Sequence, residues 1–444
     1  MTYPEAVTYL ESLIDYERTP AGAAAARLWN LDRIRWLLGR VGDPHLGLRC
    51  LHIAGTKGKG STAAMAASIL QAAGLRVGLY TSPHLVSFRE RIRVGRRLIS
   101  EPEVVALVEQ TQPHIGSLRG TEVGAPSFFE AYTLMAFLHF ARAGVELAVM
   151  ETGLGGRLDA TNVVQPLACA ITRIGLDHTH ELGDTLAAIA AEKAGIIKPG
   201  VTAISAPQEP EALEVLQDTC LERGAQLLVV GQPGGPSVAL GAVEPGRQIF
   251  TVHGLRHSYQ DLACPLVGAH QAENAAVAIG LVEALVRYGI EVSPDEVAKG
   301  IASVHWPGRF QIVSRRPWLI LDGAHDELGA GALSATLEDI FPGLRLILVL
   351  GVGKDKDAGA IAARLCPRAE RVICTASSSP RALDAEDLRR AAYRYCPHTA
   401  AYTPVALALE EALNQARPTD LVVVTGSLYV VGEAMQALGV GETG

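Results

Sequence analysis

Two lysines and a pair of adjacent hydroxyls, Ser61 and Thr62, stand in a glycine-rich run that has the chemistry of a phosphate-binding loop. Residues 55–62 read Gly-Thr-Lys-Gly-Lys-Gly-Ser-Thr, after an apolar, strand-like stretch and before a helix-forming one. In that arrangement backbone N–H groups and a helix N-terminus converge on phosphate oxygens. Lys59 would place its charge beside the β- and γ-phosphates, and Ser61 or Thr62 would offer a hydroxyl to a phosphate-bound Mg²⁺.

The run departs from the strict G-x-x-x-x-G-K-[ST] pattern, because Gly60 separates the lysine from the serine. Glycines alone would be explained by a flexible turn. The lysine, the paired hydroxyls and the strand–helix context favour a ligand, so we predict that Gly58 to Thr62 bind ATP.

An acidic residue follows another apolar stretch. Glu151 ends the run Val145–Met150 and precedes Thr-Gly-Leu-Gly-Gly. Ligands of open α/β sheets bind beyond the carboxyl ends of the strands, and in phosphate-loop proteins an acid there positions Mg²⁺. A helix cap or a structural ion pair is the alternative. The glycines favour a ligand, because they let backbone approach it closely.

Two further segments carry ionisable groups. Residues 175–183 read Gly-Leu-Asp-His-Thr-His-Glu-Leu-Gly, and His178 is one of two candidate metal or phosphate ligands there. A buried hydrogen-bonding histidine is the alternative. Lys193 lies in the largely apolar stretch Leu186–Ile197. It is either a surface lysine with a buried stem or a buried amine of lowered pKa, and a neutral amine can be carbamylated by CO₂.

Four positions nearer the C-terminus complete the candidates. Asn274 falls in the first turns of a predicted helix, where it would read an adenine edge or cap the helix. Arg309 follows a Trp-Pro-Gly break, and Asp322 and His325 follow the apolar stretch Leu319–Leu321. Each would lie where the second domain faces the first, with loose ion pairing as the alternative.

Short apolar runs alternate with helix-forming segments, which predicts α/β domains built on parallel sheets covered on both faces. The predicted strands of the first domain are Leu51–Ile53, Arg76–Tyr80, Leu147–Met150, Cys169–Thr172, Thr202–Ser205 and Leu227–Val230. The predicted helices are Ser61–Ala73, Glu103–Thr111, Phe129–Ala143, Thr185–Ile196, Glu209–Arg223 and Gln271–Tyr288. Residues 231–267 are expected to form a β-hairpin or loops.

After the break the alternation begins afresh, which predicts a smaller, Rossmann-like α/β domain. Its strands are predicted at Trp318–Leu321, Leu346–Leu350, Arg371–Cys374 and Leu421–Val424, and its helices at Gly331–Ile340, Asp384–Tyr395 and Val405–Gln415. We therefore divide the chain into an ATP-binding domain over 1–303, a linker over 304–308 and a C-terminal domain over 309–440.

Composition narrows the partners. The chain has 444 residues, 48% of them hydrophobic, and a net charge of −8. No long basic run is present, so nucleic acid is not an expected partner. The seven cysteines are scattered and odd in number, which favours reduced thiols in the cytoplasm. No secretory signal and no span of about 20 apolar residues occurs, so no membrane is expected. We expect a monomer that acts on small molecules.

Taken together, these segments resemble the folylpolyglutamate synthase and dihydrofolate synthase family, within the Mur ligase superfamily. The resemblance extends from about residue 30 to 430. The motifs that carry it, in the family's order, are Gly55–Thr62, Thr81–Leu85 with Arg89–Ile92, Glu151–Asn162, Asp177–Thr179, Glu192–Gly195, Trp306–Phe310 and Asp322–His325.

The resemblance implies an ATP-dependent amide ligase. Such an enzyme joins L-glutamate to the carboxylate of a folate, or of dihydropteroate, through an acyl phosphate and releases ADP and phosphate. A peptidoglycan ligase acting on a UDP-muramyl acid is one alternative, and a phosphate-loop kinase that forms no amide is another. Which of dihydropteroate and folate the enzyme accepts is not readable from the sequence.

The resemblance also implies roles for individual residues. It assigns Mg²⁺, expected as two ions, to Ser82, Glu151 and His178, and makes Lys193 the carbamylated lysine of the superfamily. Lys59, Lys193 and His178 are the implied catalytic residues. Asn274, Arg309 and Asp322 match ATP-contacting positions, with His325 beside them. The pterin is expected near Ser127, Phe128, Phe129 and Glu130, and near Leu158, Asp159 and Ala160. Asp326 departs from the Asn that many relatives carry after Ala-His.

Overall fold

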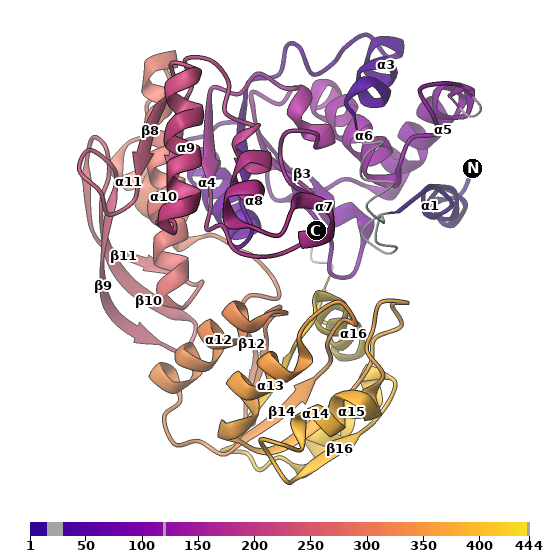
Figure 1. Cartoon of the computed structure of the whole chain (residues 1–444), viewed down its shortest axis with the longest axis vertical. Helices are drawn as coiled ribbons and strands as arrows, with labels where there is room; N and C mark the ends of the chain where they lie inside the picture. The colour runs from indigo at the N-terminus through magenta and orange to yellow at the C-terminus, as the bar shows by residue number, and fades with distance from the viewer. Residues whose placement is uncertain (16–29, 119–120, 442–444) are drawn as a thin grey trace.

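Three β-sheets organise the chain in the computed structural model, which describes residues 1–15, 30–118 and 121–441. Two of them belong to what we call the N-terminal lobe, from α1 (Tyr3–Glu11) to α11 (Pro294–Ala302). The third forms the C-terminal lobe, from β12 (Gln311–Arg315) to α16 (Leu428–Leu438). In Figure 1 the C-terminal lobe, orange to yellow, lies below the N-terminal lobe. The division into domains at residues 304–308 stays a prediction.

The main sheet of the N-terminal lobe has eight strands in the order β4-β3-β2-β5-β1-β6-β7-β8. From β2 onward every pair is parallel, whereas β4 and β3 form an antiparallel edge. The strands are β1 (Cys50–Ala54), β2 (Val77–Tyr80), β3 (Ile92–Val94), β4 (Arg97–Leu98), β5 (Leu147–Glu151), β6 (Ala168–Ile171), β7 (Thr202–Ser205) and β8 (Gln226–Val229). The parallel α/β class is therefore confirmed.

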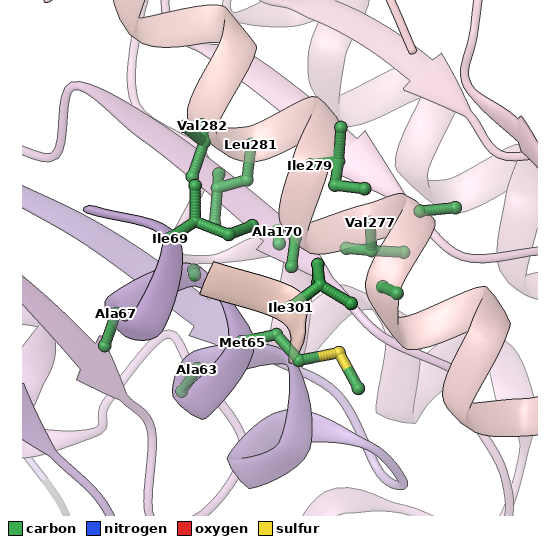
Figure 2. Packing of buried hydrophobic residues seen from close by; sticks show 14 of the residues in the cluster. Ala63, Met65, Ala67, Ile69, Ala170, Val277, Ile279, Leu281, Val282 and Ile301 are labelled. Atoms are coloured by element: carbon green, nitrogen blue, oxygen red, sulfur yellow. The ribbon is translucent and has the colours of Figure 1, made fainter. Parts of the chain in front are cut away.

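Helices cover both faces of this sheet because its strands alternate their side chains between two apolar layers. One layer joins the sheet to α4 (Lys59–Ala72), α10 (Ala269–Glu283) and α11. Figure 2 shows part of it, with Met65 and Ile69 of α4 beside residues of α10 and Ile301 of α11. The opposite face carries α1, α3 (Asp32–Arg40), α5 (Glu101–Ser117) and α6 (Phe128–Arg142), and, beside them, α8 (Leu186–Ala194) and α9 (Pro210–Glu222).

The segment predicted as a hairpin or loops forms a three-stranded antiparallel sheet. Its strands are β9 (Ser237–Glu244), β10 (Arg247–His253) and β11 (Ser258–Cys264). Phe250, Val252 and Leu262 of this sheet join the apolar layer of α4 and α10. The predicted helix Gln271–Tyr288 is interrupted, since α10 ends at Glu283 and a 3₁₀ turn covers Ala284–Tyr288.

The C-terminal lobe has a six-stranded sheet in the order β12-β13-β17-β14-β15-β16, antiparallel only between β12 and β13. After β12 its strands are β13 (Trp318–Leu321), β14 (Leu346–Leu350), β15 (Ala369–Cys374), β16 (Thr399–Ala401) and β17 (Leu421–Thr425). One face packs against α12 (Glu327–Ile340), α13 (Ala358–Leu365) and α14 (Ala385–Ala392), and the other against α15 (Val405–Gln415) and α16.

Among the described residues no helix is both long enough and apolar enough to cross a bilayer. All seven cysteines are buried free thiols.

Candidate active site

A cavity of about 680 Å³ lies where the carboxyl ends of both parallel sheets meet. The N-terminal lobe lines it with the phosphate loop, the loops after β5 and β6, the start of α6, and one residue of α8. The C-terminal lobe contributes the loops after β13, β14 and β17. Residues separated by hundreds of positions in the sequence therefore line one cavity.

Most of the residues singled out in the sequence line this cavity. They are Gly58, Lys59, Gly60, Ser61, Ser82, Ser127, Phe129, Glu130, Glu151, Leu158, Asp159, Ala160, His178, Lys193, Asn274, Arg309, Asp322 and His325. Two do not line it. Thr62 is fully buried in α4. Phe128 is buried in the core, where its ring packs against Phe88 and Tyr132.

The phosphate loop needs its glycines because side chains of other segments pack too closely against it to leave room for a β-carbon. Gly58 has a φ of +90°, a left-handed conformation that side chains disfavour, and a β-carbon there would collide with the Asn274 amide. A β-carbon at Gly60 would lie 2.8 Å from the Trp306 ring. The amide of Asn274 donates to Gln271 Oε1 at 3.1 Å, so it is buried but oriented. The conformation of the loop is thus constrained by Asn274 of α10 and by Trp306, which pack against it.

Lys59 and Lys193 meet at one backbone oxygen. Lys59 Nζ donates to the carbonyl of Gly55 at 3.1 Å, and Lys193 Nζ donates to the same oxygen at 2.8 Å. Burial lowers the pKa of Lys59, and it lowers the pKa of Lys193 to about 7, with repulsion from Lys59 adding to the effect. Lys193 is only 4% exposed, which excludes a surface lysine. Its amine is therefore available in the neutral form near pH 7.

Glu151 is a buried carboxylate that faces the cavity. Burial raises its pKa to about 7, although Lys59 opposes the shift. The backbone N–H of Ser82 donates to Glu151 Oε2 at 3.2 Å, which brings that serine to the same wall. A carboxylate stabilised so incompletely by the protein suits a divalent cation, and a hydroxyl oxygen beside it suits Mg²⁺. The donor set of this wall therefore fits the magnesium site expected there.

His178 lies in the loop after β6 with a φ of +52°, immediately before the short helix α7 (Thr179–Leu182). Its side chain is exposed within the cavity, yet the surrounding protein removes enough water to lower its pKa to about 4. The ring is therefore neutral at pH 7 and can offer a nitrogen lone pair to a metal.

The wall built from α6 and the loop after β5 is held by its own hydrogen bonds. Ser127 and Glu130 form a capping box at the start of α6, and Arg33 Nε donates to Glu130 at 2.9 Å. Asp159 accepts from the backbone N–H groups of Gly153, Leu154 and Thr161. These acids orient the wall, while Phe129, Leu158 and Ala160 give it an apolar surface.

Asp322 fastens the segment just before β12 to the loop after β13. Its two carboxylate oxygens accept from the backbone N–H groups of Phe310, at 2.8 Å, and Ala324, at 2.9 Å. Arg309 Nη1 donates to the carbonyl of Gly308 at 3.0 Å, and the guanidinium lines the cavity. His325 Nδ1 lies 2.8 Å from the carbonyl of Gly323. Arg309 is the cation of this group that can face phosphate.

Sequence reasoning missed two lysines of the cavity. Lys57, in the phosphate loop itself, contacts Asp177, His325 and Asp326. Lys356, in the loop after β14, contacts Asp177 at 2.7 Å. The second lysine of the glycine-rich run was the available signal for the first. No signal in the sequence pointed to Lys356, because its acidic partner Asp177 is 179 positions away in the chain.

A phosphate loop closed by a second α/β lobe defines the class of the Mur ligases. Residues 53–282 match the Mur ligase middle domain, and residues 308–428 match the glutamate ligase domain of Mur ligases. Members of that class that are similar along nearly the whole chain narrow the assignment further.

The chain is 38% identical over 410 residues to the dihydrofolate synthase/folylpolyglutamate synthase of Bacillus subtilis, covering 92% of this chain and 94% of that protein. It is 39% identical over 440 residues to a probable bifunctional folylpolyglutamate synthase/dihydropteroate synthase of Halobacterium salinarum, and it spans 98% of its own length but only 51% of that relative. A Mycobacterium tuberculosis folylpolyglutamate synthase, solved in complex with ADP, is 33% identical with a TM-score of 0.90 and 99% of each chain covered. This chain belongs to the folylpolyglutamate and dihydrofolate synthase family of ATP-dependent ligases.

Proposed function

We propose that this protein uses ATP to join L-glutamate to the carboxylate of a folate, and also to that of dihydropteroate. The observation that carries the proposal is the single cavity, where the phosphate loop, a buried carboxylate and an apolar wall containing Phe129 face one another. An aromatic wall suits a flat pteridine ring, whereas the phosphate loop suits a nucleoside triphosphate. ADP in the similar mycobacterial structure supports the nucleotide part.

The chemistry follows from the need to activate an acid. The acceptor carboxylate takes the γ-phosphoryl group of ATP, which forms an acyl phosphate and releases ADP. The amine of glutamate then attacks the acyl carbon, phosphate leaves, and the amine gives up a proton as the amide forms. Lys59 offsets charge on the transferring group, and Arg309 faces it from the other lobe.

Magnesium would be held by Glu151, Ser82 and His178, and it would supply charge neutralisation at the phosphates. A carbamate on Lys193 would add anionic oxygens beside that site. We also propose that Asn274 reads the adenine and that the wall of α6 holds the pteridine. The protein works in the cytoplasm, in keeping with its seven free thiols, and as a monomer.

The experiment is a substrate comparison with purified protein. ATP and L-glutamate are supplied with tetrahydrofolate, with dihydropteroate or with a UDP-muramyl acid, and ADP and amide are both measured. We expect amide with the pteridine acids, and no sustained ADP release without glutamate. Turnover on the UDP-muramyl acid alone would favour a peptidoglycan ligase, and ADP release that ignores the amino acid would favour a kinase. Lys59→Ala should abolish turnover whether the accepted substrate is a pteridine acid or the UDP-muramyl acid.

A further inference from the structure

The phosphate loop carries a second lysine, Lys57, which has no role in the ATP binding proposed for Lys59. The Nζ atom of Lys57 lies 3.1 Å from Asp177 Oδ2 and 3.1 Å from His325 Nε2, and it forms an ion pair with Asp326 Oδ2. Asp177 belongs to the N-terminal lobe, whereas His325 and Asp326 belong to the loop after β13 of the C-terminal lobe. One ammonium group therefore touches acceptors from both lobes.

The number of donors matches the number of acceptors. An ammonium has three N–H donors and no acceptor. The Nδ1 atom of His325 faces the carbonyl of Gly323, which can only accept, so that nitrogen carries the proton and Nε2 is left to accept from Lys57. The other oxygen of Asp326 caps α12 by accepting from Gly329 N–H at 2.8 Å. Asp177 accepts through its other oxygen from His178 N–H at 3.1 Å, so each of the three acceptors is oriented by a second hydrogen bond.

The same three residues have the spacing of a cation site. The ligand atoms of Asp177, His325 and Asp326 all lie within 4.8 Å of one another, close enough to surround a metal ion. The ammonium of Lys57 already stands among them. It therefore satisfies the two carboxylates and the imidazole as a cation that is tethered to the phosphate loop.

A second ion pair crosses between the lobes beside the first. Lys356 of the C-terminal lobe holds Asp177 Oδ1 at 2.7 Å, so this aspartate receives one lysine from each lobe. The four side chains are between 11% and 25% exposed, which protects the pairs from solvent screening. Two lysines and two aspartates balance in charge. Loss of Lys57 would leave the carboxylate of Asp326 without this cationic partner.

We propose that Lys57 is a positioning residue whose ammonium joins the phosphate loop to the C-terminal lobe and so keeps the cavity closed while the activated acid is present. The part of this inference that concerns catalysis rests on the proposed function. Closure matters because an acyl phosphate exposed to water hydrolyses instead of meeting the amine. A loosened cluster should therefore uncouple ATP consumption from amide formation, and it should spare ATP binding, which belongs to the neighbouring Lys59 and the loop backbone.

The test is the ratio of ADP released to amide formed. Lys57→Met removes the ammonium and keeps the chain length, and we expect about a threefold or larger rise in this ratio with the KM for ATP changed less than kcat. Lys57→Arg, which keeps the charge and offers five donors, should restore coupling in part. The matched control is Lys299→Met, at an exposed position of α11. A ratio in Lys57→Met equal to that of the wild type overturns the proposal.

A double substitution tests whether the effect passes through the other lobe. Asp326→Asn should raise the ratio by itself, and adding it to Lys57→Met should raise it little further, because both changes break the same contact. Full additivity of the two effects contradicts a bridge between the lobes. Asp339→Asn, at the far end of α12, is the control. Should Lys57→Met fail to fold, the near-isosteric Asp326→Asn carries the test alone.

A readout without turnover separates this inference from the proposed function. Small-angle X-ray scattering should give a larger radius of gyration for Lys57→Met than for the wild type, since the lobes lose an ionic link. If the wild type makes no amide, the proposed function fails, and scattering still decides on the bridge. If the radius of gyration of Lys57→Met equals that of the wild type, the bridge between the lobes is overturned as well.

Discussion

Glu151→Gln should make the metal-free protein more stable, and increasingly so as the pH rises. An exposed glutamate titrates near 4.5, whereas burial raises the pKa of Glu151 to about 7. Its ionised form is therefore less favourable in the folded state than in the unfolded chain. The penalty is absent below the ordinary pKa, grows between about pH 4.5 and 7, and is complete above that range. Glutamine has the same shape and still accepts the hydrogen bond from Ser82.

The size of the effect follows from the two pKa values. At about 1.4 kcal/mol for each tenfold change, the penalty is roughly 1.4 kcal/mol at pH 5.5 and roughly 3 kcal/mol at pH 8.5. The gap in unfolding free energy between variant and wild type should thus widen by about 2 kcal/mol over that range. It should narrow in the presence of Mg²⁺ if this carboxylate binds the ion.

Urea unfolding in EDTA, repeated from pH 5.5 to 8.5, measures that gap directly. Glu214→Gln, at an exposed site on α9, is the control and should show no comparable widening. A gap that stays constant, or that closes as the pH rises, would refute the reasoning, because it would mean that the folded protein stabilises the charged form of Glu151.

Three further expectations test other parts of the site. Lys193, with a pKa of about 7, has more than a thousandfold more neutral amine at pH 7 than an ordinary lysine. In labelled bicarbonate, ¹³C NMR should therefore show a carbamate signal that is lost in Lys193→Met. Persistence of that signal in the variant would contradict the assignment. Gly58→Ala should weaken ADP binding about tenfold by calorimetry, through the left-handed backbone and the contact with Asn274. Gly74→Ala, equally left-handed but with open space around it, should not, and equal losses would remove the steric argument. Asp159→Ala should cost about 3 kcal/mol of unfolding free energy because several buried donors lose their acceptor, and a change below about 1 kcal/mol would count against that role.

The parallel sheets were predictable because their strands are continuous apolar runs. Trp318–Leu321 and Leu346–Leu350 have the predicted bounds. The short strands β3, β4, β12 and β16, at or next to the sheet edges, were missed, since they are only partly buried and offer no apolar run of that length. The start of α12 was also missed. It begins at Glu327, capped by Asp326, before the apolar pattern that marked the predicted helix.

Residue type predicted the cavity better than it predicted the role of each side chain. Phe128 and Phe129 are neighbours in one aromatic pair, yet one is buried in the core and the other lines the cavity. Helix geometry causes this difference, because successive side chains point about 100° apart and only one of the two faces the cavity. Likewise, Ser127 and Glu130 are occupied in capping α6, a local signal that the S-x-x-E spacing carries by itself.

The two lysines at Gly55 explain why a neutral or anionic group is favoured at position 193. Lys59 and Lys193 both donate to one carbonyl oxygen, and each ammonium raises the free energy of the other. Loss of a proton from Lys193 removes the repulsion, whereas carbamylation replaces it with attraction. Lys59 would then stand between the phosphates of ATP on one side and an anion on the other. The burial that makes Lys193 a poor cation would thus let a carbamate there support Lys59 in its proposed role.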